Sequence, residues 1–171
     1  MNAAMLMAKT ISLFRCLGKT EHDPARLLAR LNAELVETAS RGMFVTMAVG
    51  VFDVGSGEIV FANAGHQPPL YRNRSGVYSE IEESSPPLGI LGGMDYAVQR
   101  IRLDGGRLYL CTDGVTEGWA DDGKMLGLDG FKALLDQHAS LSAADQLAQV
   151  AEALVRPGAR LRDDLTLLVI G

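Results

Sequence analysis

The chain has 171 residues, of which 47% are hydrophobic and 22% are charged, a composition typical of a globular protein with a well-buried core. Its formal net charge is −5 and its sequence holds no cluster of lysine and arginine, which argues against nucleic-acid binding. The apolar stretch 3–17 contains Lys9 and Arg15, is too short to span a bilayer, and lacks the features of a signal peptide. We therefore expect a cytoplasmic protein that binds neither nucleic acid nor membranes.

Two helices are predicted at the N-terminal end. Residues 3–17 are rich in alanine, methionine and leucine and are followed by Gly18, a common helix terminator. Asp23 and Pro24 predict the start of a second helix, because aspartate is a good N-cap and proline fits the first helical position. Leucines then recur at helical spacing to about Ser40, which gives this helix one apolar face.

The middle of the chain changes to the pattern of strands. Predicted strands occupy residues 44–53, 58–62, 70–72, 77–81, 97–103 and 107–111. The glycine-rich residues 55–57 predict a hairpin between the first two of these strands, and residues 104–106 predict another between the last two.

The last third returns to helix and ends on a strand. Helices are predicted at 128–137 and at 142–155, where Ser142 with Asp145 resembles a capping box and Pro157-Gly158 ends the helix. The final strand is predicted at 165–170. Since strands and helices do not alternate, the fold class is α+β with antiparallel sheet, in a single domain over residues 1–171.

Two acidic motifs are the strongest functional signal. Residues 111–117 read Cys-Thr-Asp-Gly-Val-Thr-Glu at the end of one apolar strand, and residues 162–166 read Arg-Asp-Asp-Leu-Thr at the start of another. Carboxylates held at rigid strand ends and aimed at one point suit a hard divalent cation. Taken singly, Asp-Gly is also a common turn and Asp-Asp a common solvated edge. The pair favours a metal site.

The two cysteines do not predict a catalytic nucleophile. Cys16 and Cys111 each lie in an apolar stretch, which favours reduced thiols in the core over a disulfide. A nucleophilic cysteine in a phosphate-binding loop would be expected in the pattern Cys-x5-Arg, and Cys111 is not followed by arginine at that spacing.

Several segments together resemble the metal-dependent PPM-type protein serine/threonine phosphatases, in the bacterial branch typified by sporulation stage II protein E. Besides the two acidic motifs, the matching segments are Ala-Ala-Met-Leu-Met-Ala at 3–8, Phe-Val-Thr at 44–46, Asn-Ala-Gly-His-Gln-Pro-Pro-Leu at 63–70 and Pro-Leu-Gly at 87–89. The resemblance implies two packed antiparallel β-sheets flanked by α-helices. It also implies hydrolysis of phosphoserine or phosphothreonine by two-metal activation of water, with two Mn²⁺ or Mg²⁺ ions.

Site residues follow from the resemblance position by position. Asp113 and Asp163 resemble metal-ligating aspartates of the family, with Gly114 and Asp164 beside them. His66 matches a motif position that shapes the loop near the site, and a packed or turn-stabilising histidine is the preferred interpretation of it.

The sequence departs from the family pattern at its beginning. Relatives carry a Gly-Asp-x-Ser-Gly-x-Gly segment with a metal-bridging aspartate before the Ala-Ala-x-Leu-Met-Ala segment, and this chain starts just after that point. We therefore expect a domain that lacks its N-terminal strands and its first metal-binding segment. Such a domain would hold at most one ion weakly and would itself be inactive. The parent protein would be the enzyme.

The resemblance to this family also implies the partners that we expect. The substrate would be a phosphoprotein such as an anti-sigma-factor antagonist, and a sensor or receiver domain would precede the domain in the parent. Unpaired strand edges predict self-association of this chain. The alternative function is a non-catalytic module with a degenerate phosphatase fold that binds a partner.

Overall fold

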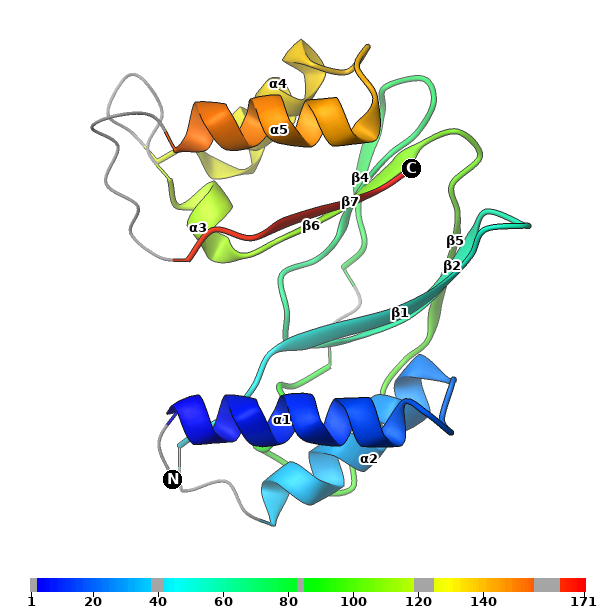
Figure 1. Cartoon of the computed structure of the whole chain (residues 1–171), viewed down its shortest axis with the longest axis vertical. Helices are drawn as coiled ribbons and strands as arrows, with labels where there is room; N and C mark the ends of the chain where they lie inside the picture. Colours follow the sequence, from blue (N-terminus) through cyan, green and yellow to red (C-terminus); the bar gives the residue numbers. More distant parts are fainter. Residues whose placement is uncertain (1–2, 38–41, 83–84, 119–124, 156–163) are drawn as a thin grey trace. The chain divides into compact units, whose positions relative to one another are not determined.

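The computed structural model describes residues 3–37, 42–82, 85–118, 125–155 and 164–171 (Figure 1). These residues form two compact units. The first unit comprises Met1–His66 and Glu83–Arg102, and the second comprises Gln67–Glu82 and Leu103–Gly171.

The first unit combines two helices with a three-stranded antiparallel sheet. The helices are α1 (Ala3–Leu17) and α2 (Pro24–Val36), and the strands are β1 (Met47–Asp53), β2 (Glu58–Ala64) and β5 (Gln99–Arg102). The strand order is β1-β2-β5, so β1 lies at an edge of this sheet. In Figure 1 the two helices run along one side of β1 and β2.

The core of the first unit lies between α2 and one face of the sheet. Leucines at helical spacing on α2 are fully or almost fully buried, as the sequence pattern predicts: Leu27, Leu28, Leu31 and Leu35. They belong to one apolar cluster with Val49 of β1 and Ala62 of β2, which face each other across the strand pair. Removing these side chains from water is the main driving force for this unit.

The second unit combines a four-stranded antiparallel sheet with three helices. The strands are β3 (Leu70–Arg72), β4 (Tyr78–Glu80), β6 (Arg107–Cys111) and β7 (Leu167–Ile170), in the order β4-β3-β6-β7. The helices are α3 (Asp113–Thr116), α4 (Gly127–Gln137) and α5 (Ala143–Leu154). Tyr109 of β6 and Phe131 of α4 meet edge to face in the core, with ring centroids 6.4 Å apart.

Helix boundaries follow the predicted caps closely. The carboxylate of Asp23 accepts the N–H of Arg26 at 3.0 Å and Pro24 opens α2, while the hydroxyl of Ser142 accepts the N–H of Asp145 at 3.1 Å and caps α5. Helix α2 ends at Val36, earlier than the predicted Ser40, which lies outside the described residues together with Pro157-Gly158. The predicted fold class, α+β with two antiparallel sheets and flanking helices, is confirmed.

Two predictions about local structure are wrong. Residues 97–103 and 107–111 do not form a hairpin, because β5 pairs with β2 in one sheet whereas β6 pairs with β3 and β7 in the other. The turn between them contains Asp104 at φ 44° and Gly105 at φ 78°, and it leads the chain from one sheet into the other. Cys16 is exposed and is therefore not a core thiol, while Cys111 is half-buried, and both are free.

Candidate functional site

The first acidic motif and the described part of the second, Asp164–Thr166, meet at one end of the four-stranded sheet. Strands β6 and β7 are antiparallel, and their last pair on this side joins Cys111 to Leu167. Asp113 follows the end of β6 and Asp164 precedes the start of β7, so strand pairing brings the two segments to the same sheet end.

Thr112 connects the two segments through three hydrogen bonds. Its backbone N–H donates to the carbonyl of Thr166 at 3.1 Å, and its hydroxyl donates to the carbonyl of Asp164 at 2.8 Å. The same hydroxyl accepts the N–H of Thr166 at 2.9 Å. The ladder between β6 and β7 is thus extended beyond the last strand pair by a side chain.

Asp113 is an exposed residue on a short, well-anchored helix. It opens α3, whose Gly114 and Val115 are buried, with Val115 packed into the core of the second unit. One carboxylate oxygen of Asp113 accepts the N–H of Gly114 at 3.0 Å, and its backbone carbonyl accepts the N–H of Glu117 at 2.7 Å. Burial of Val115 therefore fixes the backbone from which the Asp113 carboxylate reaches solvent.

The other predicted metal ligand, Asp163, falls just before the last described range, which begins at Asp164. Asp163 is outside the described residues, whereas Asp164 is described and exposed. Within the described ranges, no group of three or more histidine, cysteine, aspartate or glutamate side chains is placed to hold a metal ion. The donors that are present, exposed carboxylates at a strand end, are of the type that Mn²⁺ and Mg²⁺ prefer, and in that respect they fit such an ion.

Cys111 lies next to this sheet end but is poorly suited to attack a phosphate. Its sulfur lies 3.9 Å from Oε1 of Gln67. Burial, and secondarily the charge of Asp113, raises the pKa of the Cys111 thiol to about 11, so it stays protonated at neutral pH. This agrees with the prediction that the chemistry does not use a cysteine nucleophile.

The segment around His66 forms a tight turn in the first unit. The side chain of Asn63 closes the turn, because its Nδ2 donates to the His66 carbonyl at 2.9 Å and its Oδ1 accepts the His66 N–H at 2.8 Å. Gly65 has φ +71°, and a Cβ on it would stand 2.5 Å from Cγ of Pro87. The backbone of His66 thus has a turn-stabilising role, while a role of its side chain near the acidic motifs stays a prediction.

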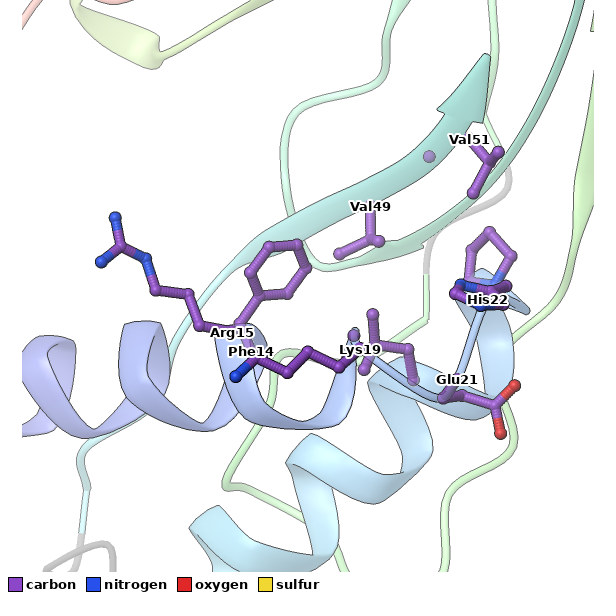
Figure 2. A pocket seen from close by; sticks show the side chains of 11 residues that line it. Phe14, Arg15, Lys19, Glu21, His22, Val49 and Val51 are labelled. Atoms are coloured by element: carbon purple, nitrogen blue, oxygen red, sulfur yellow. The ribbon is translucent and has the colours of Figure 1, made fainter. Parts of the chain in front are cut away.

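A separate pocket of about 320 Å³ lies in the first unit between α1, the start of α2 and β1 (Figure 2). Its lining includes apolar Phe14, Val49 and Val51, with Phe14 pointing from α1 toward β1. Charged Arg15 and Lys19 also line it. None of the residues predicted to bind metal belongs to this pocket.

Sequence reasoning identified the two acidic motifs but not the threonine that joins them. A side chain that bonds across strands leaves no periodic signal, so the sequence pattern alone does not predict the role of Thr112. The register of β6 against β7 was the missing information. Helix α3 was missed as well, because four residues are too few to show helical periodicity.

Comparison with known protein families gives one match over the whole chain. The family model described as Stage II sporulation protein E matches residues 1–171. The phosphoserine phosphatase RsbU of Bacillus subtilis is 27% identical over 171 residues, which cover 98% of this chain and 51% of RsbU. Protein IcfG of a Synechocystis strain is 25% identical over 138 residues, which cover 78% of this chain and 22% of that protein. The chain therefore spans about half the length of RsbU and less of IcfG.

Solved structures show the same fold. The structure of the RsbU and RsbW domains of a Mycobacterium tuberculosis protein is similar with a TM-score of 0.81 and 28% identity, covering 98% of this chain and 47% of that chain. The PP2C phosphatase domain of SpoIIE from Bacillus subtilis is similar with a TM-score of 0.76 over 96% of this chain and 49% of that chain. At 18% identity, the second likeness concerns the fold alone. Across the described residues, no helix has both the length and the apolar character needed to cross a membrane.

Proposed function

The chain belongs to the Stage II sporulation protein E family, and on this premise we propose that it is a serine/threonine phosphatase domain of a bacterial signalling protein. The observation that carries the proposal is the junction of the two acidic motifs at the end of β6 and β7. That junction brings the backbones of Asp113 and Asp164, which are far apart in sequence, to the same end of the sheet. It supports catalysis better than it supports the alternative of a non-catalytic binding module, which has no need for these acids.

The proposed metal ligands are Asp113 and Asp163, with Gly114 and Asp164 supporting them. When bound, Mn²⁺ or Mg²⁺ ions supply Lewis-acid polarisation of a phosphoryl group and of an attacking water. The chain's own residues would orient the Asp113 carboxylate that binds the ion. The N–H of Gly114 holds one oxygen of the Asp113 carboxylate at 3.0 Å, and buried Val115 keeps that backbone in place.

The proposed substrate is a phosphoserine or phosphothreonine on a cytoplasmic regulatory protein, of the kind represented by anti-sigma-factor antagonists. Support comes from the similarity to RsbU, which is named a phosphoserine phosphatase. Because the chain spans about half of RsbU, a sensor or receiver domain in a longer polypeptide is part of the same proposal. Self-association of the 171-residue chain is also proposed, and the place of β1 at the edge of its sheet, as far as the described residues show, supports it.

The function is tested by Mn²⁺-dependent release of phosphate from a phosphoserine peptide. The assay uses the 171-residue chain and any longer natural polypeptide that contains it. In the active form, we expect Asp113→Asn and Asp163→Asn each to lower the rate by at least about 100-fold, since loss of even a ligand's hydrogen-bonding partner typically costs about 10- to 100-fold. The matched control is Asp129→Asn, which removes an exposed acid on α4 and should leave the rate unchanged.

Two results would contradict the proposal. One is a phosphatase activity that survives removal of divalent cations by a chelator. The other is full activity of Asp113→Asn in a polypeptide whose unsubstituted form hydrolyses the peptide.

A further inference from the structure

Thr112 occupies a position that the proposed metal chemistry does not itself explain. It is neither acidic nor a predicted ligand, yet its side chain makes two of the three hydrogen bonds that join the acidic segments. Its neighbours in sequence, half-buried Cys111 and exposed Asp113, lie on either side of the point where β6 ends and α3 begins. A residue at this point can fix the distance between the two segments.

The hydroxyl of Thr112 both donates and accepts a hydrogen bond. As a donor it holds the carbonyl of Asp164 at 2.8 Å, and as an acceptor it holds the N–H of Thr166 at 2.9 Å. Both partners are backbone groups that flank Leu165, so the loop that enters β7 is held on both sides of one residue. Strand pairing alone reaches only to Cys111 and Leu167.

We propose that Thr112 is a positioning residue that sets the place of Asp164, and with it the entry to β7, relative to Asp113. This inference rests on the proposed function, because the position that Thr112 sets would affect how tightly the carboxylates of the proposed site bind a divalent cation. Without the hydroxyl, the carbonyl of Asp164 and the N–H of Thr166 each lose the hydrogen bond that ties them to Thr112. The segment then samples more positions, and an ion must order it on binding, which weakens binding.

The experiment uses Mn²⁺ as the probe and the 171-residue chain as the protein. Paramagnetic broadening of the backbone amide signals of Asp113 and Asp164 in NMR spectra reports on the bound ion without an activity assay. We expect Thr112→Val, which keeps the size of the side chain and removes the hydroxyl, to need about 10-fold more Mn²⁺ for the same broadening. Thr112→Ser keeps the hydroxyl and should stay within about twofold of the unsubstituted chain, by the same reasoning.

Hydrogen exchange tests the geometry independently of the metal. The N–H of Thr166 should exchange faster in Thr112→Val than in the unsubstituted chain or in Thr112→Ser, because the hydroxyl is its acceptor. The control is Thr116→Val. The hydroxyl of Thr116 donates to the carbonyl of Asp113 at 3.2 Å within α3 and does not bond to the β7 segment, so exchange at Thr166 should not change.

The outcomes separate this inference from the function on which it rests. Absence of Mn²⁺ broadening near Asp113 in the unsubstituted chain would overturn the proposed metal site and the positioning role together. Broadening that is equal in the unsubstituted chain and in Thr112→Val would overturn the positioning role alone. Weaker binding in Thr112→Val with unchanged protection of Thr166 would also overturn it, since the loss would then come from another cause.

Discussion

At the scale of single residues, the buried side-chain amide of Gln146 makes three hydrogen bonds within the second unit. Its Oε1 accepts from Nη1 of Arg107 at 2.7 Å and from the hydroxyl of Tyr109 at 2.9 Å. Its Nε2 donates to the carbonyl of Leu135 at 2.7 Å. One side chain of α5 thus satisfies polar groups of β6 and α4, and only 1% of its surface is exposed.

We expect Gln146→Leu to lower the free energy of unfolding by about 1–3 kcal/mol, because the buried Tyr109 hydroxyl would lose its acceptor, while the Leu135 carbonyl and the Arg107 guanidinium would each lose one of two hydrogen bonds. Chemical denaturation followed by circular dichroism measures this difference. The control is Gln149→Leu, the same change at an exposed position of the same helix, which should stay within about 0.5 kcal/mol of the unsubstituted chain. Equal stability of the two variants would mean that the network around Gln146 contributes little.

At the scale of elements, the turn after β2 is fixed by a close contact with a neighbouring segment. Gly65 has φ +71° and abuts Pro87, while Leu88 forms a bridge with Val45. Asn32 of α2, which is 1% exposed, holds this segment from the other side by accepting the N–H of Gly89 at 2.9 Å. Motif segments that are far apart in sequence therefore support one another in the first unit.

Gly65→Ala should destabilise the chain by more than Gly57→Ala, although both residues have a positive φ. At Gly57 a Cβ meets nothing within 4 Å, so only backbone strain of about 1 kcal/mol is expected. At Gly65 the Cβ also collides with the ring of Pro87, which adds about 1–3 kcal/mol. Thermal denaturation of both variants compares the two losses, and a smaller loss for Gly65→Ala would show that the Pro87 segment moves away freely.

The elements also show how far the sequence alone can predict this structure. Helices α1, α2, α4 and α5 could be placed, since their periodicity and the caps Asp23 and Ser142 are local signals. The positions of the strands could also be predicted from the sequence, but not every pairing between neighbouring strands could. Asp104-Gly105-Gly106 has the composition of a hairpin turn, and only the competing pairing of β5 with β2 decides against one. Asp113 could be identified from its motif, whereas the role of Thr112 depends on the register of β6 against β7.

At the scale of the whole molecule, β1 leaves one strand edge without a partner among the described residues. Val51 on this edge strand is 47% exposed and Phe52 is 39% exposed. Exposed apolar edges favour pairing between chains. Self-association through β1 is therefore expected at micromolar concentration.

Sedimentation velocity checks this expectation. Val51→Lys puts a charge on the edge strand and should shift the chain toward the monomer. The matched control is Val54→Lys, which adds the same charge just beyond the strand at a position that is 82% exposed, and should leave the association unchanged. A monomer in the unsubstituted chain, or equal association of both variants, would contradict pairing through β1.

The way the chain is divided between the two units determines what would follow if the backbone were cleaved. The backbone passes from one unit to the other after His66, after Glu82 and after Arg102, so neither unit is a continuous stretch of sequence. A single cut at the turn between β3 and β4 would give two polypeptides, the first with β1 to β3 and the second with β4 to β7. Since β2 pairs with β5 and β3 pairs with β6, each polypeptide would need strands of the other to rebuild both sheets. The chain is thus suited to complementation between two halves that are each incomplete alone.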